Sequence, residues 1–272
     1  MNKKNSIIIA VALIIALVGL IVLANVLKGN NAEGSKENLT QSNASTANKI
    51  LNIDELFTDR DLKQEADLTG ATKLGVSDDT DVNITKEGIY VISGTAKNAT
   101  INVEVGDEEK VQLVLNDLNI TNIDKECIHV ENADKVFITT STQCNLSYSA
   151  TDAENATGAI LSRDDITFNG AGILTINSDN NGIVGKDDIK ITGGTYNITA
   201  SKNCIRANDS IRIAGGTFEL KAGTDGLHAE NNDDDAKGYI YINSCTLNIN
   251  ADDDALHAVT IVQIDGGTIK IT

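Results

Sequence analysis

Apolar and polar residues alternate along most of the chain after position 82, and short polar turns interrupt the alternation at regular intervals. The pattern is clearest in DIKITGGTYNIT (188–199) and in SIRIAGGTFELK (210–221), where every second residue is apolar. A period of two predicts half-buried β-strands, whereas a helix requires a period of 3.6, which is absent. The Gly-Gly pairs mark the turns between strands.

The same pattern returns at a nearly fixed distance. The apolar residues Ile183, Ile205, Leu227 and Leu256 open four copies spaced 22, 22 and 29 residues apart, and an earlier copy opens at Ile160. Cys127-Ile128-His129-Val130 resembles a copy that lies still earlier in the chain. A period near 22 predicts a solenoid with three short strands per turn and rungs about 4.8 Å apart. We therefore expect an all-β, right-handed parallel β-helix, filled by ladders of apolar side chains and covered by ladders of polar ones.

The N-terminal residues differ from the repeats. Lys3 and Lys4 precede an uncharged run of 18 residues, 7–24, which is long enough to cross the ~30 Å core of a bilayer. We interpret 1–28 as an uncleaved signal-anchor with the lysines inside, and a cleaved signal peptide is the alternative. Residues 29–60 are expected to form a flexible linker and lead-in. The mixed charged and apolar stretch 50–67, which runs from this lead-in into the β-helix, is expected to form a short helix, an irregular segment or a cap. The β-helix is expected over 61–272 and, because it stops in mid-rung at Thr272, the natural protein is expected to continue.

This arrangement predicts an extracellular protein on the cell surface, anchored to the plasma membrane, or secreted if the signal is cleaved. The net charge of −17 and the pI near 4.4 argue against nucleic acid and anionic membrane surfaces as partners. They suit a protein that collects divalent cations. Cys127 and Cys204 share one ladder position about three rungs apart, which is too far for a disulfide. All four cysteines are predicted to be unpaired core or turn residues, and we expect a monomer.

Polar residues at the turns align from copy to copy. Asn181, Asn203, Asp225 and Asp254 form one column, and Asp187 stacks with Asp209 at the next corner. Carboxylates one rung apart repel each other, and hard oxygens on a rigid backbone suit Ca²⁺. The insertion 230–235 is expected to complete a site with the acidic turn 252–254. The predicted Ca²⁺ ligands are Asn181, Asp187, Asn203, Asp209, Asp225, Asp252, Asp253 and Asp254; the alternative is that these turns are simply solvated. Zinc is disfavoured because no Cys/His cluster has ligand spacing.

Two outward-facing columns carry the remaining candidates. One contains Leu161, Val184, Arg206, His228 and His257; the other contains Thr167, Lys190, Arg212, Tyr241 and Gln263. Two cations beside an aromatic tip could hold the carboxylates of an acidic sugar chain lying along the helix axis. The alternative is that the cations only make the surface soluble. The predicted sugar contacts are Lys190, Arg206, Arg212, Tyr241 and His228. As a pair, His228 and His257 fit surface residues better than ligands, and no catalytic residue is assigned.

Several phrases resemble one bacterial family. They are KEGIYVISGT (86–95), VQLVLN (111–116), SRDDITFNG (162–170), DGLHA (225–229) and KGYIYI (237–242). Over about residues 80–272 the chain resembles the carbohydrate-binding-domain-containing proteins of the clostridial cellulose- and pectin-binding β-helix type. The resemblance implies a right-handed parallel β-helix similar to pectate lyases, exported, calcium-binding and attached to plant-type polysaccharide without established catalysis. Family members tend to read Asp-Gly-Ile at the rung openings, and here 225–227 follows that pattern while 181–183 and 203–205 depart from it.

The expected function is therefore calcium-dependent binding of cellulose, or of acidic polymers such as polygalacturonate, without catalysis. A calcium-dependent lyase with Arg206 or Arg212 as base is one alternative, and a non-binding structural stalk is the other. The short loops argue against a lyase, because enzymes of this shape build their clefts from longer loops. The absence of Trp argues against sugar binding by ring stacking, an objection that ionic recognition avoids.

Overall fold

The computed structural model describes residues 51–152 and 154–272. The predicted signal-anchor and most of the predicted linker lie outside these residues. In the part of the chain that is described, no helix is long and apolar enough to cross a membrane.

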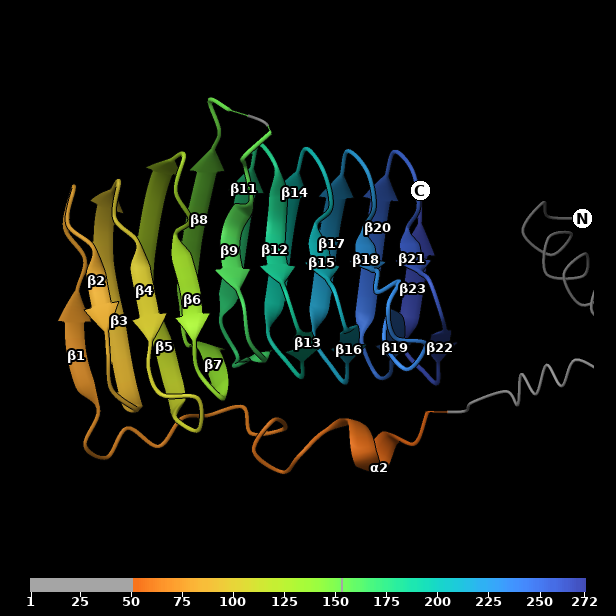
Figure 1. Ribbon diagram of the computed structural model, residues 1–272, viewed down its shortest axis with the longest axis horizontal. Helices are drawn as coiled ribbons and strands as arrows, with labels where there is room; N and C mark the ends of the chain where they lie inside the picture. The colour runs from red at the N-terminus through yellow and green to blue at the C-terminus, as the bar shows by residue number, and fades with distance from the viewer. Residues whose placement is uncertain (1–50, 153) are drawn as a thin grey trace, which may run out of the picture. The chain divides into compact units, whose positions relative to one another are not determined.

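The described chain coils into stacked turns whose strands form three parallel faces (Figure 1). The first face contains β2 (Val82–Ile84), β4 (Ile101–Glu104), β6 (Ile128–Asn132), β9 (Gly158–Ser162), β12 (Asn181–Gly185), β15 (Ile205–Ala207), β18 (Leu227–Ala229) and β21 (Leu256–Ala258). The second face contains β7 (Lys135–Thr140), β10 (Ile166–Asn169), β13 (Asp188–Ile191), β16 (Ser210–Ile213), β19 (Tyr239–Ile242) and β22 (Val262–Ile264). The third face contains β8 (Gln143–Ser149), β11 (Ile173–Ser178), β14 (Thr195–Ala200), β17 (Thr217–Ala222), β20 (Thr246–Ala251) and β23 (Thr268–Ile271).

Two long strands join the second and third faces at the start of the coil. β5 (Lys110–Ile123) pairs with β7 through its first half and with β8 through its second half. β3 (Gly88–Lys97) pairs alongside β5, with a register shift between Ile92 and Gly94, and β1 (Thr72–Gly75) pairs with β3. A bulge at such a position bends a strand, so one strand can serve two faces.

The register confirms the predicted repeat. Ile160, Ile183 and Ile205 pair in parallel from rung to rung, and the same column continues through Leu227 to Leu256. Both outward columns pair as predicted. The all-β parallel coil is therefore confirmed, and its right-handed sense stays a prediction.

The interior is a continuous apolar core built from these ladders. Ile189, Ile211 and Ile240 stack with no exposed surface, and burying each side chain is worth about 1.5–3 kcal/mol. The rings of Tyr196 and Phe218 stack with their centroids 5.1 Å apart. All four cysteines are free and buried, as predicted.

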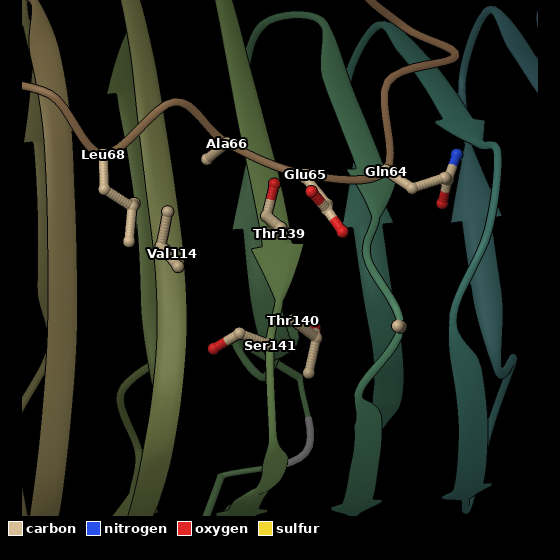
Figure 2. Close-up of a pocket in the computed structure, with 9 residues that line it drawn as sticks. Gln64, Glu65, Ala66, Leu68, Val114, Thr139, Thr140 and Ser141 are labelled. Carbon is tan, nitrogen blue, oxygen red and sulfur yellow. The ribbon is translucent and has the colours of Figure 1, made fainter.

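Residues 51–68 form a strap along the second face, running across the rungs in the reverse order of the coil (Figure 1). The strap begins at Leu51, whose N–H donates to Gln263 Oε1 on β22 at 2.8 Å, and then forms α2 (Ile53–Leu56), a helix of one turn. An irregular segment follows, and its Leu68 end lies beside Val114 of β5 (Figure 2). The lead-in thus contains both a short helix and an irregular segment, and both pack on the β-helix.

Candidate functional site

The strap places a buried ion network over the predicted sugar-binding column. The Asp61 side chain is fully buried, with its carboxylate 3.4 Å from Lys190 Nζ and 3.5 Å from Lys135 Nζ. Burial alone would raise the pKa of Asp61, but the Thr58 amide and the two lysines lower it overall. The pKa of Lys190 is lowered by burial and by Lys135, because both lysines share one carboxylate. Lys190 therefore neutralises Asp61 instead of facing solvent.

Arg212 and Tyr241 are also engaged beneath the strap. Arg212 Nη2 lies 2.6 Å from Asp188 Oδ2, and its guanidinium stands over the ring of Tyr239. Tyr241 is fully buried against Phe57 of the strap, and burial raises its pKa to about 12. The column Lys190–Arg212–Tyr241 points outward as predicted, but it is covered. The expectation of an open sugar-binding surface at these three residues is corrected accordingly.

A cavity of about 320 Å³ lies between the strap and the second face, and Figure 2 shows residues that line it. Glu65 is its charged lining residue, and the others are Gln64, Ala66, Leu68, Val114, Thr139, Thr140, Ser141 and Ala171. The hydroxyls of Thr139 and Ser141 are already hydrogen-bonded within the protein. The cavity therefore offers few free polar groups to a sugar.

The predicted calcium column is largely a structural ladder. Asn181 Oδ1 accepts the N–H of Asn203 at 3.2 Å, Asn203 Oδ1 accepts the N–H of Asp225 at 3.0 Å, and Asp225 Oδ1 accepts that of Asp254 at 3.0 Å. Asn181 and Asn203 are buried, and their oxygens bond the next rung. Each side chain thus satisfies a buried backbone donor. The prediction that Asn181 and Asn203 are metal ligands is corrected for that reason.

Carboxylates gather only at the last described rungs of this corner. Oxygens of Asp225, Asp253 and Asp254 lie within 4.8 Å of one another. Asp252 is exposed and stands outside this cluster. Three carboxylates within such a distance can hold a hard divalent cation if further oxygens complete its coordination.

The other predicted acidic corner, between the first and second faces, is neutralised by the protein itself. A hydrogen bond with Asp209, together with burial, raises the pKa of Asp187 to about 7, so the two carboxyl groups share a proton. Asp209 also accepts Asn231 Nδ2 at 3.0 Å and pairs with Lys237 Nζ at 2.6 Å. The insertion after β18 therefore folds over Asp209. The expectation that it completes a site with 252–254 is corrected, because that turn lies at the corner between the third and first faces.

Three cations stand close together at the edge of the first face. Arg163 follows β9, Lys186 follows β12, and Arg206 belongs to β15, the next strand of that face. The pKa of Lys186 is lowered by partial burial and by the charges of Arg206 and Arg163. Arg163 pairs with Glu131 at 2.7 Å, whereas Lys186 and Arg206 make no ion pair within 51–152 and 154–272. We call these residues the cation triad.

Sequence reasoning found Arg206 but missed its two neighbours. Arg163 and Lys186 both follow an aligned pair, Ser162 and Gly185, and both precede an aspartate of the acidic corner. This alignment is the feature of the sequence from which Arg163 and Lys186 could have been predicted as neighbours. His228, the last predicted sugar contact, is half-buried on the first face between Asp225 and Glu230.

Comparisons with known proteins agree with this architecture. Residues 78–272 match the family described as "Carbohydrate-binding domain-containing protein". A protein of that description from Acetivibrio thermocellus is 45% identical over 203 residues, covering 71% of this chain and 70% of the relative. A solved structure described as the polysaccharide lyase-like protein from C. thermocellum, a gadolinium derivative, superposes with a TM-score of 0.61 at 32% identity. It covers 73% of this chain and 93% of that one. The chain belongs to the carbohydrate-binding domain-containing protein family.

Proposed function

We propose that this protein is exported, tethered at the cell surface by its N-terminal segment, and binds polysaccharide in a calcium-dependent manner without cleaving it. The cation triad is the observation that carries the proposal. In a chain with a net charge of −17, partial burial and the like charges of Arg206 and Arg163 on neighbouring rungs lower the pKa of Lys186. An anionic ligand would relieve that repulsion.

An acidic sugar chain suits the triad. Guanidinium groups bind carboxylates through two parallel hydrogen bonds, and a lysine adds a point charge. Rungs of a parallel β-helix lie about 4.8 Å apart, so the cations meet a polymer that runs along the helix axis. Arg206 keeps its predicted role, and Lys186 and Arg163 take the places predicted for Lys190 and Arg212.

Calcium is proposed at Asp225, Asp253 and Asp254, whose oxygens are close enough to share one ion. The gadolinium derivative of the solved relative supports this choice, because Gd³⁺ is also a hard cation that prefers oxygen ligands. A bound Ca²⁺ would offset the repulsion among these three carboxylates and hold the last described rungs in place. Its absence should therefore weaken binding indirectly.

The third face provides a second surface, suited to a neutral polymer such as cellulose. Thr195, Thr217, Thr246 and Thr268 form one outward ladder there. Beside it runs a ladder of two amides and two charged side chains, Asn197, Glu219, Asn248 and Lys270. The strap leaves this face open, and uncharged donors and acceptors match a polymer of hydroxyl groups.

Retention on polygalacturonate and on cellulose, with and without Ca²⁺, tests the proposal. Lys186→Gln and Arg206→Gln should each weaken polygalacturonate retention by about 10- to 150-fold, since a hydrogen bond to a charged group is worth about 1.5–3 kcal/mol. Lys221→Gln, at an exposed cation on β17, is the matched control and should change nothing. If the double variant of Lys186 and Arg206 bound polygalacturonate as well as the unaltered protein, the triad would not be the contact.

One observation favours the lyase alternative. The lowered pKa of Lys186 brings this amine closer to the range of a general base, and two arginines stand beside it. The same incubation reports on it, because a lyase produces an unsaturated sugar that absorbs in the ultraviolet. Absorbance that rises with the unaltered protein and stays flat with Lys186→Gln would establish the lyase. Retention without absorbance is the outcome expected here, and neither signal would indicate a stalk.

A further inference from the structure

Beneath the strap, the second face carries an outward column with the composition of a ligand site. In register, one residue per rung, the column reads Phe137, Thr167, Lys190, Arg212 and Tyr241. Ligand sites combine aromatic side chains with a few polar or charged groups that fix orientation. The aromatic rings at the two ends of this column point out of the coil, yet the strap keeps at least 98% of their surface from water: Phe137 is 2% exposed and Tyr241 0%.

The strap places a carboxylate in the middle of this column. Asp61 lies 3.4 Å from Lys190 Nζ and 3.5 Å from Lys135 Nζ, and Thr167 Oγ1 donates a hydrogen bond to its Oδ1 at 3.2 Å. Two ammonium groups and a hydroxyl thus converge on one fully buried carboxylate. All three groups belong to the β-helix, so the carboxylate site remains when the strap leaves.

Gln64 fills a second slot, three residues further along the strap. Its Oε1 accepts the N–H of Gly170 at 3.2 Å, and its Nε2 donates to the carbonyl oxygen of Thr192 at 3.1 Å. A Cβ at Gly193 would overlap Gln64 Oε1, so the slot exists because residue 193 is glycine. A sugar hydroxyl both donates and accepts hydrogen bonds, and it can therefore use the same backbone donor and acceptor.

The course of the strap is also that of a bound polymer. The strap crosses the rungs along the axis of the coil (Figure 1), which is the direction inferred for an acidic polymer at the cation triad. Its Phe57 ring covers Tyr241 with the centroids 6.2 Å apart. The strap therefore presents to the second face a ring, a carboxylate and an amide in succession along one line.

We propose that the strap mimics a ligand, and that the second face beneath it is a second binding site for an acidic polysaccharide, which the polymer reaches when the strap lifts. A uronate carboxylate takes the position of Asp61 between Lys190 and Lys135, and sugar rings pack on Phe137 and Tyr241. This second site rests on the proposed function, since it takes the same class of polymer.

The strap closes the site reversibly. It buries Leu51 and Leu56, whereas Leu62 and Leu68 stay 48% and 53% exposed. A site that is accessible only in the open form binds with its intrinsic affinity multiplied by the open fraction. The unaltered protein should therefore bind acidic polymer mainly at the cation triad and only weakly at the second face.

Binding of soluble polygalacturonate to the full chain with Lys186→Gln and Arg206→Gln both present isolates the second face. Adding Asp61→Ala, which opens the strap, should raise the affinity roughly 150-fold, because affinity follows the open population while that population is small. Adding Lys190→Gln as well should remove most of the gain. Asp67→Ala, at an exposed strap carboxylate, is the matched control, because it changes the net charge equally and should give no gain.

Trypsin cleavage after Arg60 and Lys63 reports in the same samples whether the strap is open. An open strap without the gain in affinity would overturn the proposal. An equal gain with Asp67→Ala would overturn it too, because net charge alone would then explain the binding. Polymer retention by the double variant before the strap is opened would instead count against the cation triad, and the comparison with Asp61→Ala would still report on the second face.

The unaltered protein provides an independent test. A ligand that binds only the open form raises the population of that form, so polygalacturonate should accelerate trypsin cleavage within the strap, and a neutral polymer should not. Cleavage that stays unchanged at high polygalacturonate concentration would overturn the proposal, even if Asp61→Ala left the strap closed.

Discussion

Asp61→Ala should release the strap from the second face. The substitution removes the carboxylate shared by Lys190 and Lys135 and leaves both lysines beneath the strap, with Asp165 3.4 Å from Lys135 as the remaining counter-charge. It also leaves the Thr58 amide, 2.9 Å from Asp61 Oδ2, without its acceptor. Removing one partner of a buried ion pair typically costs 3–5 kcal/mol.

The loss cannot exceed the free energy that docks the strap, because a strap that lifts lets water reach both lysines. The strap buries Leu51 and Leu56, each worth about 1.5–3 kcal/mol, so it can absorb a loss of this size locally while the β-helix stays folded. A loss of about 3 kcal/mol raises the population of open strap roughly 150-fold. The melting temperature of the β-helix should change little by comparison.

Limited trypsin digestion measures this opening, since Arg60 and Lys63 lie within the strap and cleavage requires an unfolded segment. Cleavage should accelerate by about two orders of magnitude in Asp61→Ala, and less in Asp61→Asn, which keeps an acceptor and removes only the charge. Asp67→Ala, at an exposed strap carboxylate, is the control. If Asp61→Ala were cut no faster than Asp67→Ala, the buried network would not be what holds the strap.

Three further predictions follow from the rungs. The pKa of Asp187 in the folded protein, about 7, lies above that of an unfolded aspartate. Its contribution to folding stability is therefore complete below about pH 4 and is lost as the pH rises toward 7. Asp187→Asn should remove that loss and raise the melting temperature at pH 8 by 2–4 °C, about 1 kcal/mol after solvent screening. Gly182→Ala should cost about 1–3 kcal/mol in denaturant unfolding, since its Cβ would lie 2.5 Å from the Cys204 carbonyl oxygen; a neutral result would mean that the backbone yields there. Arg212→Ala should destabilise the fold, because it leaves the Asp188 carboxylate half-buried and unpaired, yet keep polygalacturonate retention; lost retention with an unchanged melting temperature would restore the predicted sugar surface.

The repeat was visible in the sequence because each rung obeys the same constraint. A position such as Ile189 must fill the interior beside its equivalents in the next turns, so its period is imposed at every turn. The columns followed directly, and every predicted pairing between Ile160 and Leu256 is present. The same spacing predicted that Cys127 and Cys204 do not form a disulfide with each other.

The cover of the second face could not be predicted in this way. Asp61 meets Lys190 across 129 positions, and no periodicity links a single strap to the ladder beneath it. The pattern of charged residues did not indicate this cover either, because an outward-facing lysine on a strand gives the same sequence pattern whether it is exposed to water or covered by Asp61. The direction in which a side chain of a column points could not be predicted from the alignment either. Asn203 Oδ1 points along the axis to the Asp225 amide, and the alignment that revealed the column is equally compatible with an oxygen pointing at a metal.

The three faces differ in which side chains they expose to a ligand, and this difference says more about where a polysaccharide can bind than the family relationship does. The strap occupies the second face and compensates its charges, so a polymer cannot reach them without lifting the strap. The third face is open and mostly uncharged, while the first face and its corners hold the cation triad and the carboxylates of Asp225 and Asp254. Acidic and neutral sugars should therefore bind to different faces of the same coil. Competition between polygalacturonate and cellulose would show instead that one surface serves both, and the separation argued here would fail.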